Sequence, residues 1–168
     1  FGLFGFLLFV ITCGMGYSLL GGALTLAIMV LPLIMRTTEE ALLSVPDAFR
    51  EGSFGLGAGR LRTIFRIVLP SAMPGILSGV ILAIGRIVGE TAALMFTAGT
   101  ASTVATSPLA SCRTLAVHMY VLLNEGLYMN QAYATAVVLL VMVILINALS
   151  SFAAKKLSSN GGKDRKNG

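Results

Sequence analysis

The chain has 168 residues, of which 56% are apolar and only 11% are charged, and its mean hydropathy is +0.89. These values lie outside the usage of soluble globular domains and indicate a membrane protein. The net charge of +5 is accounted for by Lys and Arg on the cytoplasmic side of a membrane, so nucleic-acid binding is not expected.

Three long tracts with almost no charge predict membrane-spanning helices. Residues 1–35 and 126–154 contain no Asp, Glu, Lys or Arg, and residues 67–112 contain only Arg86 and Glu90. Each tract is longer than the roughly 20 apolar residues that cross a bilayer as a helix. The chain is therefore predicted to be all-α, a polytopic bundle of transmembrane helices.

The first tract is too long for a single span and should break near Gly14–Gly16. This break leaves the end of one span at residues 1–13 and a complete span at about 17–35. Two further spans are expected, one from about residue 70 into the nineties and one from about 133 to 154.

The distribution of Lys and Arg predicts the orientation. The loop at residues 36–66 and the tail at residues 156–168 are basic, whereas the connection at residues 91–132 contains only Arg113 among Lys and Arg. Because cytoplasmic loops are enriched in these residues, we place the central loop and the C-terminus in the cytoplasm and the connection outside. The tail is polar and glycine-rich, so we expect it to be disordered.

The central loop, residues 36–66, carries helix signals. Thr38 precedes two glutamates, which is typical of a helix start, and "SVPD" repeats the signal with Ser44 as the cap and Pro46 in the first turn. We therefore expect a short helix at about 45–56.

Residues 51 to 70 have the spacing of a known motif. Glu51 is followed by two small residues, Gly52 and Ser53, then by Gly57 and, after nine further residues, by "IVLP". This pattern resembles the EAA motif of ABC-transporter permease subunits, in which two alanines occupy the positions of Gly52 and Ser53.

The resemblance implies that the short helix is a coupling helix, which projects into the cytoplasm and docks in a cleft of an ATP-hydrolysing subunit. Carried over to this sequence, the residues for ATPase coupling are Phe49, Glu51, Gly52, Ser53, Phe54 and Gly57. The two aromatic residues would be apolar anchors. Gly57 would be a position where a positive φ or a close backbone approach excludes a side chain.

The chain contains no "GxxxxGK[ST]" phosphate loop. The stretch "NGGKD" near the C-terminus lacks both the upstream glycine and the hydroxyl residue of that motif. We therefore expect no cofactor in this chain, and we assign ATP and Mg²⁺ to a partner ATPase.

Arg86 and Glu90 stand four residues apart on a predicted helix and are the only charges in their tract. Charges inside a bilayer are costly and face either a polar pathway or each other. Two interpretations stay open. The residues form a structural intrahelical pair, or they line a substrate pathway in which Arg86 binds an oxyanion, Glu90 orients it, and Thr91 and Thr97 add hydroxyl donors.

Four stretches are similar to the phosphate-specific ABC permeases, and to the PstA type more than to its PstC-type partner: "RTTEEALLSVP", "GRIVGETAALMFTAG", "RTLAVHMYVLLNEG" and "AYATAVVLL". The resemblance implies a type I importer permease of the MetI-like kind, multi-pass in the inner cell membrane, with residues 1–155 as its transmembrane domain. Because Phe1 lies inside an apolar tract without a basic segment or a cleavage site, we expect the C-terminal part of a longer chain.

The implied function is ATP-driven import of inorganic phosphate. The implied partners are a second, PstC-type permease subunit, a dimer of the PstB-type ATPase and an extracytoplasmic phosphate-binding protein of the PstS type, with membrane lipid around the helices. An importer of the same type for sulfate, molybdate or an amino acid is the alternative. An intramembrane enzyme using Glu90 or His118 lacks a second catalytic partner in the sequence.

The remaining residues carry weaker signals. Gly75 and Gly79 have the small-xxx-small spacing of closely packed membrane helices. His118 has no second His or Cys at ligand spacing, so no metal site is expected. Cys13 and Cys112 both fall near the expected outer side, and whether they pair stays open.

Overall fold

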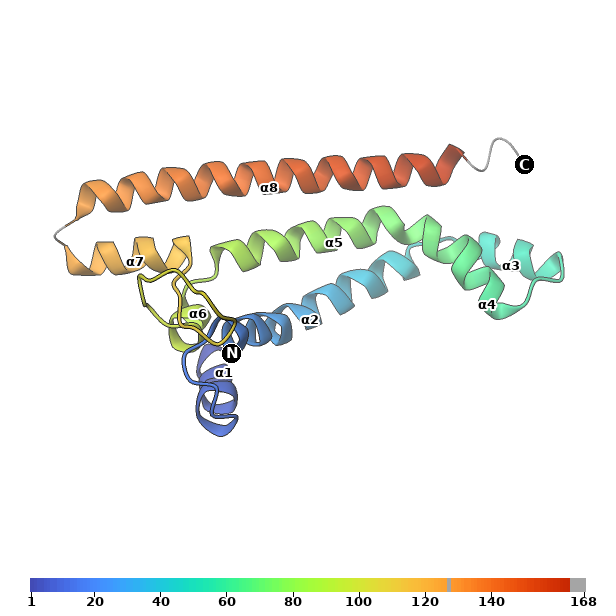
Figure 1. Cartoon of the computed structure of the whole chain (residues 1–168). Coiled ribbons are helices and arrows are strands. Elements are labelled where there is room, and N and C mark those ends of the chain that lie inside the picture. The colour runs from blue at the N-terminus through green and yellow to red at the C-terminus, as the bar shows by residue number, and fades with distance from the viewer. Residues whose placement is uncertain (127, 164–168) are drawn as a thin grey trace. The chain divides into compact units, whose positions relative to one another are not determined.

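The structure, a computed structural model, describes residues 1–126 and 128–163, with side chains through residue 154. Every regular element in these ranges is helical, and no strand occurs in them (Figure 1). The all-α prediction is therefore confirmed for the described part of the chain.

The chain forms two compact units. Among the described residues, the first unit is built from Phe1–Leu31 and Gly85–Ile146, and the second from Pro32–Ile84 together with residues 147–163. The three longest helices contribute residues to both units, and each unit is described below by itself.

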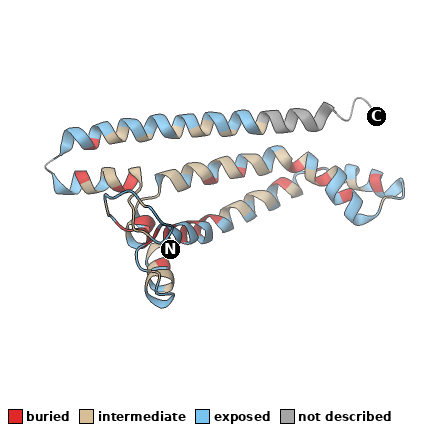
Figure 2. Cartoon of the chain, in the orientation of Figure 1, coloured by how far each residue is buried: buried red, intermediate tan, exposed pale blue. Residues whose placement is uncertain are grey.

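Three helices are long and apolar enough to cross a membrane. They are α2 (Leu19–Leu43), the continuous helix Arg60–Gly89 and the apolar part of α8, Met129–Ala154. A shorter apolar helix covers Gly2–Thr12 and corresponds to the expected end of a further span. In its most apolar 18-residue stretch α8 has no buried residue, and its residues there are half-buried or exposed (Figure 2).

The elements can be followed along Figure 1. Their bounds in chain order are α1 (Gly2–Gly5), the π-helix η1 (Phe6–Thr12), α2 (Leu19–Leu43), α3 (Asp47–Gly55), α4 (Arg60–Thr63), the π-helix η2 (Ile64–Val68), α5 (Leu69–Gly89), α6 (Ala92–Thr97), α7 (Leu115–Glu125) and α8 (Met129–Lys163).

The break after the first apolar segment lies where the sequence predicts it. Gly14 and Gly16 both have φ of +64°, a left-handed conformation that residues with side chains rarely adopt. Ser18 then caps α2, because its Oγ accepts a hydrogen bond from Gly21 N at 3.1 Å. The next backbone donor, Leu19 N, binds the carbonyl of Ala110 at 3.0 Å.

Small residues allow close packing in the first unit. A Cβ built on Gly2 would lie 2.9 Å from Ala93 Cα, so α1 and α6 are in direct backbone contact. A Cβ on Gly22 would lie 2.9 Å from Ala98 Cβ. These distances are shorter than real Cβ contacts, so a side chain at either glycine would push the helices apart.

The second unit has a small apolar core where the chain leaves and re-enters the membrane helices. Its buried members are Ala41 of α2, Val45 of the connection, Val68 of η2 and Ala72 of α5. Two glycines of α5 face the same part of α2: a Cβ on Gly75 would lie 2.7 Å from Ala41 Cβ, and one on Gly79 would clash with Thr37. The predicted packing role of Gly75 and Gly79 is therefore confirmed.

A π-helical turn precedes Pro70. Proline has no N–H and its ring crowds the carbonyl four residues earlier, so the regular helical ladder cannot continue through it. Leu69 N instead binds Ile64 O, and the hydroxyl of Ser71 donates to Ile67 O at 2.7 Å. The helix therefore enters the membrane segment without interruption.

Two predicted features of the central loop are wrong. Residues 36–43 do not begin a new helix at Thr38, because α2 continues to Leu43. Ser44 does not cap α3: its hydroxyl donates to Ala41 O at 2.8 Å, and the N-cap residue is Pro46. Helix propagation adds one hydrogen bond per residue, so an established span extends through Thr38 more readily than a new helix nucleates there.

Two helix ends also differ from the prediction. The span expected to run into the nineties ends at Gly89, and α6 begins separately at Ala92. At the C-terminus, the backbone of α8 is helical to Lys163, where we expected disorder, because an existing helix extends at little cost. Residues 164–168 of the expected tail lie outside the described residues.

Candidate functional site

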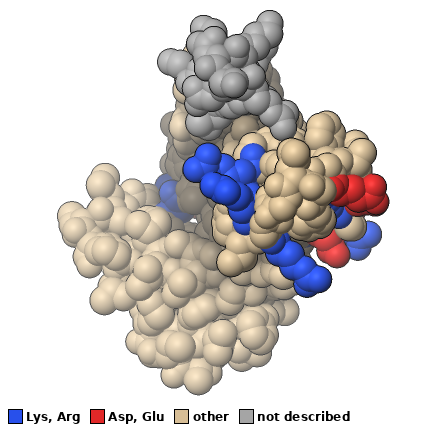
Figure 3. Space-filling view, turned by 90° about the vertical axis from the view of Figure 1, so that its right-hand side faces the viewer, with Lys and Arg blue, Asp and Glu red and all other residues tan. Residues whose placement is uncertain are grey.

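The expected coupling residues lie on α3 and the turn after it. Figure 3 views the molecule from the side on which α3 and α4 lie in Figure 1, and shows Lys, Arg, Asp and Glu side chains on the exposed surface there. Phe49 is 46% exposed and Phe54 is 47% exposed, although both are large apolar side chains. Glu51 and Gly52 are also exposed. These four residues are accessible to a docking partner.

Ser53 differs from the other expected coupling residues because it is buried. It is the only buried residue of α3, and its hydroxyl lies 2.8 Å from the hydroxyl of Thr63 on α4. Thr63 is itself buried and donates its proton to Gly59 O at 3.2 Å. Because a hydroxyl has a single proton, Ser53 is then the donor to Thr63.

Arg50 makes a second link from α3. Its Nη2 donates to the carbonyl of Leu42 in the last turn of α2 at 2.9 Å, and its Nη1 lies 3.2 Å from Asp47 Oδ1. The last carbonyls of a helix have no partner within the helix, so the guanidinium satisfies one of them. These roles of Arg50 and Thr63 were not predicted from the sequence.

Gly57 adopts φ of +78°, as a glycine at this motif position was expected to. Nothing lies within 4 Å of a Cβ built on it. The backbone conformation, and not crowding, therefore disfavours a side chain at position 57.

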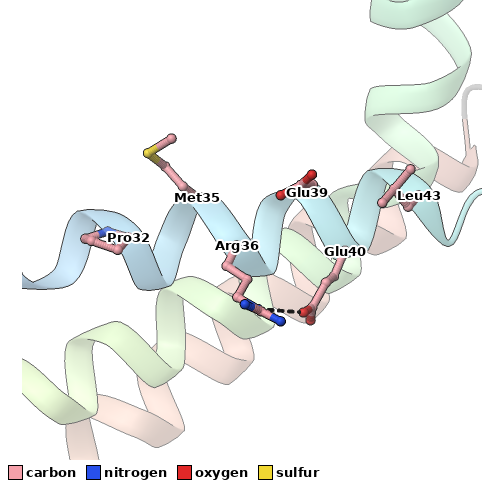
Figure 4. Close-up of a pocket in the computed structure, with 6 residues that line it drawn as sticks. All are labelled: Pro32, Met35, Arg36, Glu39, Glu40 and Leu43. Atoms are coloured by element: carbon pink, nitrogen blue, oxygen red, sulfur yellow. Dashed lines mark hydrogen bonds and ion pairs between the residues drawn. The ribbon is translucent and has the colours of Figure 1, made fainter.

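A shallow hollow with a volume of about 550 Å³ runs along the C-terminal half of α2. All its lining residues come from this one helix. Figure 4 shows Arg36 and Glu40 directed toward each other, at 3.2 Å, while Met35 and Glu39 lie on another side of the helix. A site lined by one helix cannot enclose a ligand, so we read the hollow as an exposed face of α2.

The expected substrate-pathway residues lie in the first unit, around the break between α5 and α6. Arg86 is exposed in the last turn of α5. Glu90 lies beyond the end of that helix, and its Oε1 accepts a hydrogen bond from Ala93 N at 3.1 Å in the first turn of α6. Thr91 Oγ1 lies 3.4 Å from Gly89 O.

Arg86 and Glu90 do not form an ion pair. The salt bridges found among the described residues are Arg36–Glu40 and Arg50–Asp47. The pairing interpretation assumed one continuous helix, but α5 ends between the two residues, and the Glu90 carboxylate serves as a cap for α6.

Thr97 is fully buried at 0% exposure, and its hydroxyl donates to Ala93 O at 2.7 Å within α6. This hydroxyl is therefore satisfied inside its own helix. The assignment of Arg86, Glu90, Thr91 and Thr97 to a substrate pathway stays a prediction.

An apolar cavity of about 310 Å³ lies in the first unit, next to this segment. Ile87, Val88, Leu94 and Ala98 form part of its wall, and its lining includes neither Arg86 nor Glu90. Moving an oxyanion into such a wall without a charged or hydrogen-bonding partner is strongly unfavourable. The lining also includes Cys112 and Thr114 but no charged residue, so the wall of this cavity offers an anion no charged partner.

We predict that Gly57→Ala destabilises the turn after α3, because an L-residue in the left-handed region costs roughly 1–2 kcal/mol. Hydrogen exchange of the Gly57 and Ala58 amides, which bind Phe54 O and Ser53 O, should accelerate about five- to thirtyfold. Gly57→Asn should have a smaller effect because Asn tolerates this region. Gly55→Ala, also in open space but without a positive φ, is the control, and equal acceleration in it would contradict the prediction.

Comparison with known proteins places these features in context. The family described as "Binding-protein-dependent transport system inner membrane component" matches residues 2–160. YqgI of Bacillus subtilis (strain 168), a probable ABC transporter permease protein, is 39% identical over 179 residues, covering 95% of this chain and 61% of the relative.

Two further relatives are named as phosphate transport system permease proteins. PstA 1 of Mycobacterium tuberculosis (strain CDC 1551 / Oshkosh) is 47% identical over 97 residues, covering 58% of this chain and 32% of the relative. PstA of Yersinia pestis is 37% identical over 140 residues, covering 80% of this chain and 47% of the relative. The chain spans at most 61% of the length of these three proteins. No solved structure matches the chain.

Proposed function

The chain belongs to the family of binding-protein-dependent transport system inner membrane components, and we propose that it is a PstA-type permease subunit of an ATP-driven importer of inorganic phosphate. The observation that carries the proposal is the similarity to relatives named as phosphate transport permeases, at 37% and 47% identity. The predicted family is thus confirmed, and the substrate is the proposal.

The proposed mechanism divides the work between chains. This subunit forms half of the translocation pathway, and a PstC-type permease forms the other half; a relative named PstC, from Mesorhizobium japonicum, is 33% identical over 150 residues. The sequence of this chain contains no phosphate loop. We therefore assign the binding of ATP and Mg²⁺ to a dimer of PstB-type ATPase subunits in the cytoplasm. A PstS-type binding protein delivers phosphate from the outer side.

Coupling in this proposal runs through α3. ATP binding closes the ATPase pair, which moves α3 and switches the permease pair between outward and inward access. The exposed aromatic side chains of Phe49 and Phe54 support α3 as the docking element, because aromatic anchors dominate the energetics of interfaces.

Substrate identity is tested by reconstituting the full-length subunit with its three partner proteins in liposomes. We expect ATP-dependent uptake of radiolabelled phosphate that a hundredfold excess of sulfate or molybdate leaves unchanged. Uptake of sulfate, molybdate or an amino acid in place of phosphate would overturn the phosphate assignment and support the importer of another solute.

Arg86 is predicted to contact phosphate during transport. Arg86→Gln should lower uptake per assembled complex about ten- to a hundredfold, the range of one charge-assisted hydrogen bond. Arg86→Lys keeps the charge and loses the bidentate fork, so it should keep partial activity.

The double variant Arg86→Gln/Glu90→Gln separates this role from a structural one. Since no Arg86–Glu90 ion pair is found among the described residues, the double variant should be as inactive as Arg86→Gln. Recovery of uptake in the double variant would instead indicate a charge pair and would remove Arg86 from the pathway.

The proposed topology is tested with two equally accessible positions. Leu56 in the central loop is 91% exposed and Val104 in the connection is 90% exposed. Cysteines replacing them, in a background without Cys13 and Cys112, should react with an impermeant maleimide from opposite sides of sealed vesicles. A cysteine replacing Ser158 should react from the same side as Leu56→Cys. Labelling of Leu56→Cys and Val104→Cys from one side would refute the orientation.

A further inference from the structure

The attachment of α3 poses a physical problem. The helix has nine residues, and isolated helices of this length are marginal in water. Most short helices are held by an apolar face, but the only buried residue of α3 is the polar Ser53. The apolar core below it consists of Ala41, Val45, Val68 and Ala72, none of which belongs to α3. Phe49 and Phe54 stay about half exposed, so the side-chain link of α3 that is fully shielded from solvent is polar.

The Ser53–Thr63 hydrogen bond ties α3 to one membrane helix. Ser53 is 5% exposed and Thr63 is 1% exposed, so water cannot easily replace either partner. Thr63 belongs to a helix that runs without a break from Arg60 to Gly89. A displacement of Ser53 is thus passed directly to a helix long enough to cross the membrane.

Arg50 ties α3 to the other membrane helix. Its guanidinium binds the carbonyl of Leu42 in the last turn of α2 at 2.9 Å and is oriented by Asp47 at 3.2 Å. The C-terminal end of a helix carries partial negative charge, which favours a cation at this position. Arg50 is half-buried, so the link is partly shielded from solvent.

We propose that Ser53, Thr63 and Arg50 are positioning residues that fasten α3 to both membrane helices, so that movement of α3 is transmitted to α2 and α5 together. The inference rests on the proposed function, because it assumes that α3 is moved by an ATPase. The hydrogen bond between Ser53 and Thr63 is not a general property of the EAA motif, because that motif has alanine, which carries no hydroxyl, at the position of Ser53. Without these links, α3 rotates about the turn at Gly57, and its movement is no longer transmitted to α2 and α5.

The two hydroxyls are not equivalent. Ser53→Ala removes one donor and leaves Thr63 bound to Gly59 O. Thr63→Val leaves the buried Ser53 hydroxyl without a partner and also removes the bond to Gly59, so its effect should be larger. Thr63→Ser keeps the hydroxyl and should retain the link.

The test measures phosphate imported per ATP hydrolysed by the complete complex in liposomes, normalised to assembled complex. Thr63→Val, Ser53→Ala and Arg50→Met should each lower this ratio while ATP hydrolysis continues. One lost hydrogen bond corresponds to about a fivefold loss, and Thr63→Val, which loses two, should exceed it. Thr63→Ser should keep the wild-type ratio.

Two matched controls accompany these variants. Ser71→Ala removes a hydroxyl that bonds within its own helix, at 2.7 Å to Ile67 O. Arg62→Met removes an exposed arginine of α4 for which no hydrogen bond is found among the described residues. A wild-type ratio in Thr63→Val and Ser53→Ala, or a loss in Thr63→Ser as large as in Thr63→Val, would overturn the inference.

A second measurement does not depend on the substrate. Spin labels on cysteines replacing Leu56 and Leu82, which are 91% and 65% exposed, report the distance between the end of α3 and α5 in the assembled complex. The distance distribution should broaden in Thr63→Val and stay narrow in Thr63→Ser and Ser71→Ala. A narrow distribution in Thr63→Val would overturn the inference. If the wild-type complex does not import phosphate but the distance distribution still broadens in Thr63→Val, only the proposed function is overturned.

Discussion

The close approach of α2 and α5 at Gly75 and Gly79 is the contact on which the second unit depends. A side chain at Gly75 would meet Ala41 at 2.7 Å, and one at Gly79 would clash with Thr37. In a bilayer the surrounding lipid is as apolar as the helix surfaces, so close van der Waals packing of small residues holds membrane helices together. The contact brings the end of α2 beside the start of α5, and the connection between them must turn sharply outside the membrane segments.

That geometry explains why α3 is held by polar links. The core formed by Ala41, Val45, Val68 and Ala72 is filled by the helix ends and the connection, and it contains no residue of α3. The aromatic residues of α3, Phe49 and Phe54, stay about half exposed and are available to the proposed partner. α3 reaches its neighbours through one hydroxyl pair and one guanidinium. A helix with a large apolar buried face would be more stable, but it would have fewer apolar residues left for docking.

The sequence predicts the helices well where the signal is local. Charge-free tracts locate the long helices, and the glycines near residue 15 locate the first break. The helix signals around Pro46 locate α3 approximately, and the small-residue spacing at Gly75 and Gly79 predicts their packing. The start at Thr38 and the cap at Ser44 were wrong because the local preference of a few residues was outweighed by the propagation of α2.

The candidate site was predictable only in part. Motif spacing found Ser53, but its partner Thr63 lies ten residues away across a turn, and no periodicity links the two. The interaction of Glu90 was missed because a continuous helix was assumed. Gly89 followed by Glu90 and Thr91 is a signal that could have indicated the break, since Gly weakens helices and Glu and Thr favour their first turns.

The partial exposure of the apolar residues of α3, with Phe49 at 46% and Phe54 at 47%, also has a thermodynamic consequence. The heat capacity of unfolding comes mainly from apolar surface that becomes hydrated, and the large apolar side chains of α3 are already exposed over nearly half of their surface before the helix leaves α4. Its detachment will therefore carry a small heat-capacity change and a small denaturant slope, because both scale with newly exposed surface. The α2–α5 contact below it buries apolar side chains and will show the opposite behaviour. The helix proposed to dock on an ATPase can thus open locally while the packing beneath it stays closed.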